Sequence, residues 1–192
     1  LDVHEAMPIG RVIVGEAFAS AAEEFPSVAG AAMLQMLERE GVPVSIAAAG
    51  DAYTLGSATL DVLHPPRGAD YAMDNADSIV TLVTAPTDDG PFTLLAPGDS
   101  ERVGISALGR SMPRASVDVA IVPHHGSTQP ESLGFMSSLS PSIVLQSTGD
   151  RRVALPFWAG LAERTDWYDT PTHGQINLRV RRDGSIVVDT IT

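Results

Sequence analysis

The chain has 192 residues, of which 44% are hydrophobic, 19% are charged and none is cysteine. This length and composition are typical of a domain with a packed core, and they exclude wholesale disorder and a disulfide scaffold. Without cysteine, any metal must be bound by nitrogen and oxygen ligands. No apolar run approaches the roughly 18 residues that span a bilayer, so we expect a soluble domain.

The formal net charge of −12 lies in the first half of the chain. Residues 1–100 contain 15 acidic residues against three arginines (−12), whereas residues 101–192 contain nine of each (zero). An acidic chain gains nothing from the counterion release that drives nonspecific DNA binding. A local arginine site in the second half could still bind a phosphate through paired hydrogen bonds.

The hydrophobic pattern predicts β-rich structure around one helix in the first half. In chain order, a strand at 12–14 and a helix at 28–40 come first, followed by strands at 42–47, 53–55 and 58–63. A polar loop at 67–75 leads to two further strands, at 78–84 and 92–96, which are joined by a turn-rich connection at 86–91.

The second half predicts three strand–loop–helix units. Strands at 92–96, 117–122 and 142–146 lead into helices at 101–110, 131–138 and 155–164, and a hairpin at 176–181 and 185–189 closes the chain. This succession predicts an α/β fold with a mixed sheet.

Each of these units carries polar residues just after its strand, which is the edge where open α/β sheets bind ligands. They are Asp99, the adjacent His124 and His125, and the loop at 147–152. Asp99 is either a helix N-cap or a metal-bridging carboxylate. Adjacent histidines point in different directions, so we expect at most one of His124 and His125 to serve a given site directly.

Other polar residues in these loops have two interpretations each. Ser127 is either an N-cap or a hydrogen-bonding support for an imidazole, and Ser147 lies in the loop that could give similar support. Arg151 and Arg152 form either a solvated turn or a phosphate-binding pair. We expect structural roles for the remaining histidines, which are His4, His64 and His173.

A carboxylate and an imidazole on neighbouring strand ends suit a divalent ion. Two such ions, about 3.5–4 Å apart, could generate hydroxide and clamp a phosphodiester.

Five segments, in order, resemble the metallo-β-lactamase-fold domain of ComEC/Rec2 competence proteins. They are N-x-x-S-I-V from Asn75, L-L-A-P-G-D at 94–99, V-D-V-A-I-V-P-H-H-G-S at 117–127, P-S-I-V-L-Q-S-T-G at 141–149, and D-T at 169–170 followed by G-Q-I at 174–176. The resemblance implies one domain over residues 1–192, folded as an αββα sandwich with mixed sheets and a metal site at one edge. It implies Asp99 and His124 as catalytic residues, and Asp99, His124 and His125 as ligands of Zn or Mn.

The resemblance implies a metal-dependent phosphodiesterase that acts on DNA during uptake. Two features depart from the family: its leading H-x-H-x-D-H motif is missing, and Leu155 stands where the family's G-H-P has a ligating histidine. We therefore expect weak metal binding, and two alternatives stay open: a catalytically degenerate binding or structural module, or another metallo-hydrolase.

The resemblance also implies a setting for the chain. We expect it to be the N-terminally truncated, soluble and extracytoplasmic domain of a longer bacterial cell-membrane protein. Its expected partners are DNA and the membrane channel portion of that protein.

Overall fold

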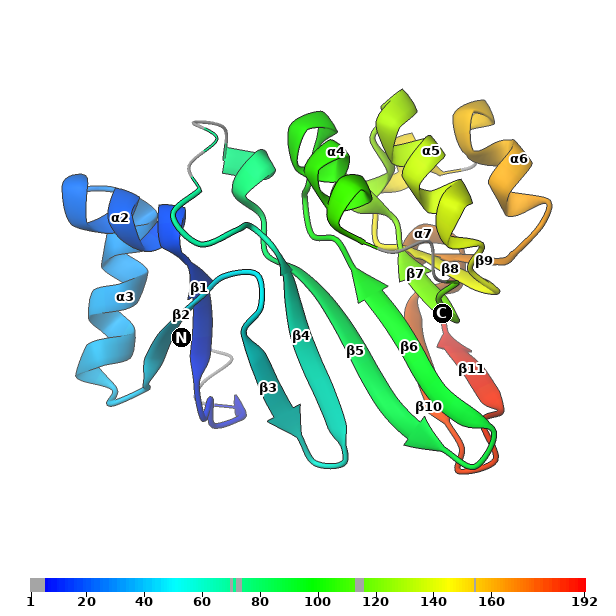
Figure 1. Cartoon of the computed structure of the whole chain (residues 1–192), viewed down its shortest axis with the longest axis horizontal. Coiled ribbons are helices and arrows are strands. Elements are labelled where there is room, and N and C mark those ends of the chain that lie inside the picture. Colours follow the sequence, from blue (N-terminus) through cyan, green and yellow to red (C-terminus); the bar gives the residue numbers. More distant parts are fainter. Residues whose placement is uncertain (1–5, 70, 72–73, 113–115, 154) are drawn as a thin grey trace.

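A seven-stranded mixed sheet organises the computed structural model, which describes residues 6–69, 71, 74–112, 116–153 and 155–192 (Figure 1). In sheet order the strands are β3 (Ala52–Leu55), β4 (Ala58–His64), β5 (Val80–Thr87), β6 (Gly90–Ala96), β7 (Val119–Ile121), β8 (Ile143–Gln146) and β9 (Asp166–Asp169). Strands β3 to β6 pair antiparallel, and β6 to β9 pair parallel. The predicted α/β class with a mixed sheet is confirmed.

Helices cover one face of the parallel half of this sheet. They are α4 (Arg102–Ser111), α5 (Pro130–Leu139) and α6 (Ala159–Ala162). Leu95 of β6 and Val144 of β8 pack in one apolar cluster with Leu108 of α4, Met136 of α5 and Leu161 of α6. All of these side chains are at least 98% buried, so this cluster is the main core.

A hairpin packs on the opposite face of the sheet. It consists of β10 (Gln175–Val180) and β11 (Ile186–Ile191), as the sequence pattern predicted. Its side chains Leu178 and Val188 pack against a buried cluster that includes Val119 of β7 and Ile143 of β8. Successive strand residues face opposite sides, so β7 and β8 supply both cores.

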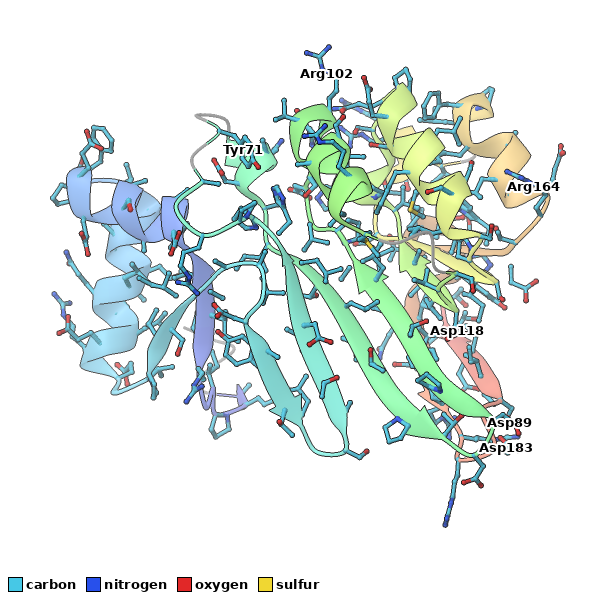
Figure 2. All side chains as sticks on the ribbon, in the orientation of Figure 1. Tyr71, Asp89, Arg102, Asp118, Arg164 and Asp183 are labelled. Atoms are coloured by element: carbon cyan, nitrogen blue, oxygen red, sulfur yellow. The ribbon has the colours of Figure 1, made fainter. Side chains whose placement is uncertain are left out.

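The tips of two hairpins meet at one end of the molecule. The Asp88 amide donates to the Arg182 carbonyl at 2.7 Å. Figure 2 shows the neighbouring tip residues Asp89 and Asp183 at this same end. Strands β5 and β6 also extend into the predicted connection, where Pro86 pairs with Pro91. Pro86 is tolerated because β4 pairs with β5 only up to Thr84, which leaves that edge of β5 open.

A separate two-stranded parallel sheet lies at the N-terminal end. Strands β1 (Val12–Gly15) and β2 (Val44–Ala47) are connected through α2 (Glu16–Glu24) and α3 (Ala29–Arg39). Helix α2 was not predicted, because it buries only Ala19 and Ala22 and has no stripe of large apolar residues. The described strands thus form three sheets, with α2 and α3 beside the two-stranded parallel one and α4 to α6 on the largest, and this mixed arrangement is consistent with the expected metallo-β-lactamase-like class.

The predicted helix at 155–164 is wrong in its extent. The segment forms a 3-10 turn, η4 (Pro156–Trp158), followed by the four-residue α6. Trp158 and Leu161 are both buried, and one turn is enough to bring them to the same side. The short β9 and α7 (Thr170–His173) follow, and neither was predicted. No described helix is long and apolar enough to cross a bilayer.

Truncating the main core should destabilise the domain. Leu95 is fully buried, so we expect Leu95→Ala to lower the free energy of unfolding by about 2–5 kcal/mol. Leu55 is 54% exposed, so Leu55→Ala should change it by less than about 0.5 kcal/mol. Urea denaturation of both variants measures the difference, and equal losses would contradict this assignment of the core.

Candidate functional site

The carboxyl ends of β6 and β7 bring two polar loops together. Strands β6 and β7 are parallel neighbours, so the residues that follow them emerge at the same edge of the sheet. The His124 amide donates to the Gly98 carbonyl at 3.1 Å and ties the two loops directly. The histidine pair lies in the 3-10 turn η2 (Pro123–Gly126).

Each histidine of the pair faces its own carboxylate. His125 Nε2 lies 3.3 Å from Asp99 Oδ1, and His124 Nδ1 lies 2.7 Å from Glu101 Oε1. The first pair is open to solvent, with His125 53% and Asp99 46% exposed, whereas the second is largely covered. The N-cap of α4 is Glu101, so Asp99 is not that helix's N-cap.

Glu101 is a site residue that the sequence interpretation missed. It contacts His124 Nδ1, and its Oε1 also accepts a hydrogen bond from Asn75 Nδ2 at 3.2 Å. His124 Nδ1 is buried, and among the described residues its short approach to Glu101 lacks the geometry of a hydrogen bond. The position of Glu101, two residues beyond Asp99, could have indicated its role in the site, but an acidic residue is also common at the start of a helix.

The backbone that carries the histidines has an uncommon conformation. His124, His125 and Gly126 have φ values of 45°, 56° and 87°, all in the left-handed region. Non-glycine residues adopt this region rarely, at a cost of about 1–3 kcal/mol each. Such a conformation persists only when the surrounding structure holds it.

Three side-chain donors hold this backbone, one for each carbonyl. Arg152 Nη1 donates to the His124 carbonyl at 2.7 Å, Gln146 Nε2 to the His125 carbonyl at 3.2 Å, and Trp158 Nε1 to the Gly126 carbonyl at 3.0 Å. Gln146 and Trp158 are at least 98% buried, so they are fixed by packing. These donors come from β8 and the segment that follows it.

A hydrogen bond to Ser147 sets the chemical state of His125. His125 Nδ1 lies 2.8 Å from the Ser147 carbonyl, which can only accept, so Nδ1 carries a proton. In that tautomer of the neutral imidazole, Nε2 presents its lone pair toward Asp99, which is the arrangement that a metal ligand requires.

The other polar residues that the sequence predicted for the site lie in the loops around the histidine pair. Ser147 acts on His125 through its carbonyl rather than its hydroxyl. Ser127 is not the N-cap of α5, which is Gln129, and Ser127 Oγ is buried with no partner among the described residues. Arg151 is exposed. Arg152 uses one N–H on the loop and keeps four others, so phosphate binding by these arginines stays a prediction.

The other histidines and Leu155 lie in structural positions. His64 is buried, its Nε2 lies 2.8 Å from the Ala76 carbonyl, and its ring stacks on Tyr71. His173 Nδ1 contacts the backbone of Asp169 within α7 and β9. Leu155 packs against the main core. His4 lies outside the described residues.

The donor set fits a weakly held ion rather than a closed zinc site. Two ligands that each lie about 2.0–2.2 Å from one ion are themselves roughly 3.0–3.5 Å apart. The 3.3 Å between His125 Nε2 and Asp99 Oδ1 has this value. However, no group of three or more His, Asp or Glu residues within the described ranges could hold a metal ion. Water would have to supply the remaining ligands.

Comparisons with known proteins assign no family. No model of a known protein family matches the chain, and no curated protein sequence matches it. A solved structure from Thermotoga maritima, described as a Zn-dependent hydrolase of the metallo-β-lactamase superfamily, shows 13% identity with a TM-score of 0.33. The match covers 54% of this chain and 49% of that one, so the chain spans about half that protein's length. A likeness this slight assigns no function.

Adding a methyl group at Gly126 should disturb the loop. A Cβ built there lies 2.2 Å from Gln146 Nε2, and the φ of 87° adds strain for any other residue. We expect Gly126→Ala to lower the free energy of unfolding by about 1–3 kcal/mol and to shift the NMR signals of the His125 imidazole.

Gly149→Ala is the matched control for this variant. Gly149 has a φ of −102° and no atom within 4 Å of a built Cβ. Its substitution should leave both the stability and the imidazole signals unchanged. Equal behaviour of the two variants would show that the loop is not held as described.

Proposed function

We propose that the chain is a metal-assisted phosphodiesterase domain that hydrolyses DNA within a protein of the ComEC/Rec2 type. The order of its motifs supports this proposal. The observation that carries it is the solvent-open Asp99–His125 pair, with Nε2 and Oδ1 3.3 Å apart at the carboxyl edge of two parallel strands. Carboxylate oxygen and neutral imidazole nitrogen are donors that Zn²⁺ and Mn²⁺ accept.

In this proposal the two imidazole–carboxylate pairs have different roles at the site. Asp99 and His125 are the groups that would hold the ion, and the Ser147 carbonyl keeps His125 Nε2 free for it. When bound, such an ion would activate water and stabilise the charge that develops on the phosphate. His124 and Glu101 form the neighbouring imidazole–carboxylate pair, which can take up or release a proton.

Two arginines provide the contacts proposed for the nucleic acid. Arg151 and Arg152 form η3 (Asp150–Arg152), which follows β8 and the Ser147 carbonyl that binds His125. Planar guanidinium groups bind phosphate oxygens in pairs. In the second half of the chain nine arginines balance nine acidic residues, so this half adds no net negative charge that would oppose phosphate binding.

We also propose the setting that the motif resemblance implies. In this proposal the chain is the soluble, extracytoplasmic part of a bacterial cell-membrane protein that takes up DNA. Its partners are the channel portion of that protein and single-stranded DNA. The support is the order of the motifs from Asn75 to Ile176.

A second candidate function is a catalytically degenerate binding module on the same fold. Two observations favour it: among the described residues two donors converge at the open site, and Leu155, at the position of a family ligand, packs into the core. This candidate predicts DNA or protein binding without hydrolysis.

Substituting the open pair distinguishes the two candidates. In millimolar Mn²⁺ we expect slow cleavage of single-stranded DNA, reduced at least about tenfold in kcat/KM by Asp99→Asn and by His125→Gln. Asp166→Asn is the control, because Asp166 is an exposed carboxylate at the amino end of β9. Cleavage that is equal in all variants, or absent from the purified wild type, would reject the hydrolase and leave the module.

Replacing one exposed arginine tests the phosphate contact separately. We expect Arg151→Ala to weaken binding of single-stranded DNA and to reduce the slope of log K against log salt by about 0.7. Arg164, an exposed residue that follows α6 (Figure 2), supplies the control variant Arg164→Ala. Fluorescence anisotropy at several salt concentrations measures both slopes, and identical slopes in Arg151→Ala and the wild type would remove the proposed contact.

A further inference from the structure

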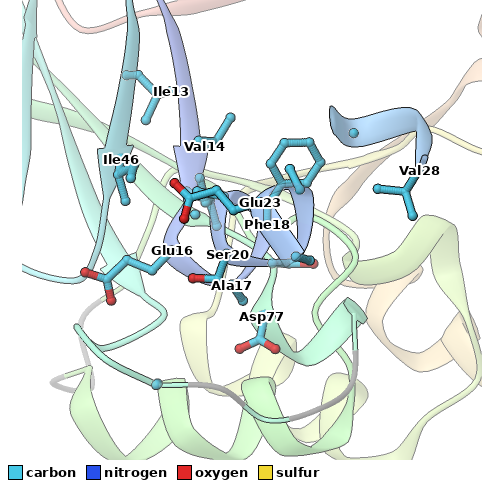
Figure 3. A pocket seen from close by; sticks show the side chains of 18 of the residues that line it. Ile13, Val14, Glu16, Ala17, Phe18, Ser20, Glu23, Val28, Ile46 and Asp77 are labelled. Carbon is cyan, nitrogen blue, oxygen red and sulfur yellow. The ribbon is translucent and has the colours of Figure 1, made fainter. Parts of the chain in front are cut away.

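A large groove with an apolar floor opens beside α2. Its volume is about 1480 Å³, and it is lined by β1, α2, parts of α3 and β2, and the segments around Arg67, Asp77 and Asp99. Figure 3 shows Ile13 and Ile46 on neighbouring strands, with Phe18 and Val28 nearby. Pockets for small molecules measure about 300–1,000 Å³, so the groove has room for a polypeptide segment.

Exposed apolar side chains are concentrated in this groove. Nine large hydrophobic residues are exposed within the described ranges, and five of them line it. These five are Phe18, Phe25, Val28, Met33 and Ile46, and they are 39–52% exposed. Scattered exposed hydrophobic residues need no explanation, but a clustered set marks an interaction surface.

Acidic side chains surround the apolar floor. Among the described residues the groove is lined by five carboxylates, those of Glu16, Glu23, Glu24, Asp77 and Asp99, and by one guanidinium, that of Arg67. Figure 3 shows Glu16 and Glu23 on α2, with Asp77 on the segment next to this helix. The side-chain charges that line the groove are therefore mainly negative, which attracts a cationic partner and disfavours anionic lipid headgroups.

The one basic side chain of the groove is already neutralised. Arg67 donates to Glu16 Oε1 at 3.1 Å and to both carboxylate oxygens of Asp51, at 2.9 and 3.0 Å. The Ala48 amide, followed by the Arg67 guanidinium, holds the pKa of Asp51 below its usual range, so Asp51 stays charged. Glu23 and Glu24 form no hydrogen bond or ion pair among the described residues and are free to meet a partner.

We propose that this groove docks a cationic, amphipathic segment of a partner protein. Its apolar side chains would cover Phe25 and Val28, and its lysines or arginines would pair with Glu23 and Glu24. Residues 1–5 of the chain lack the required charge, since they contain Asp2 and Glu5 and no basic residue except His4. The groove shares Asp99 with the proposed hydrolytic site, but the proposed docking contacts, at Phe25, Val28, Glu23 and Glu24, do not include it.

Binding of two matched peptides to the full chain tests the docking site. The probe is a fluorescein-labelled amphipathic peptide of leucine and lysine, and its counterpart has glutamate in place of lysine. We expect the lysine peptide to bind, the glutamate peptide not to bind, and Phe25→Ser/Val28→Ser to weaken binding about tenfold in fluorescence anisotropy. Leu55→Ser, an equally exposed position outside the groove, should leave binding unchanged.

A pair of charge reversals separates the groove from the overall acidity of the chain. Glu23→Lys/Glu24→Lys should weaken lysine-peptide binding at least about fivefold. Glu38→Lys/Glu40→Lys changes two exposed residues at the C-terminal end of α3, outside the groove, and should weaken binding less than about twofold. Equal effects of the two reversals would overturn the proposal. Stronger binding to phosphatidylglycerol vesicles than to the lysine peptide would overturn it in favour of a membrane surface. If the wild-type chain is a dimer and Phe25→Ser/Val28→Ser is a monomer, a second copy of the chain covers the groove and the proposal is also overturned.

Discussion

Three side-chain hydrogen bonds hold the conformation on which the candidate site depends. Arg152, Gln146 and Trp158 each donate to one carbonyl of the His124–Gly126 turn, and together they stabilise three consecutive residues in the left-handed region. Without these donors, the turn would relax to an extended path and the imidazoles would no longer face Asp99 and Glu101. The seven-stranded sheet matters to the site because it places β8, and hence these donors, next to β7.

The side chains that hold the histidine turn also contribute to the stability of the fold. Gln146 and Trp158 are buried in or beside the main core, so packing of α5 and α6 also fixes the turn. Strain stored in a backbone is common at functional sites, where it orients a side chain before any ligand arrives. Here it turns two adjacent imidazoles toward two different carboxylates, one pair open and one covered.

The sequence predicted the parts of the fold that have a strong hydrophobic period. The helix near 28–40 and the closing hairpin were found because their apolar residues recur at regular spacing, whereas α2 is alanine-rich and β9 is only four residues long. The rule that ligands bind beyond parallel strand ends located Asp99, His124 and His125. The same rule could not assign Glu101 to the site, because an acidic residue is common at the start of a helix. It also could not predict the hydrogen bond from Arg152 to the His124 carbonyl, because these residues are 28 positions apart in the sequence. A left-handed backbone at two histidines has no sequence signature.

The two halves of the chain thus carry opposite surfaces: an acidic groove with an apolar floor beside α2, and a neutral half with arginines beyond β8. Asp99 of the open Asp99–His125 pair lines this groove, and His125 faces Asp99 from the second half of the chain.

A crystal structure grown in Mn²⁺ tests the candidate site most directly, through anomalous difference density measured at the manganese edge. We expect positive φ at His124 and His125 and one ion, with its other ligands supplied by water, between Asp99 Oδ1 and His125 Nε2. An extended turn, or an ion bound only elsewhere, would contradict this expectation.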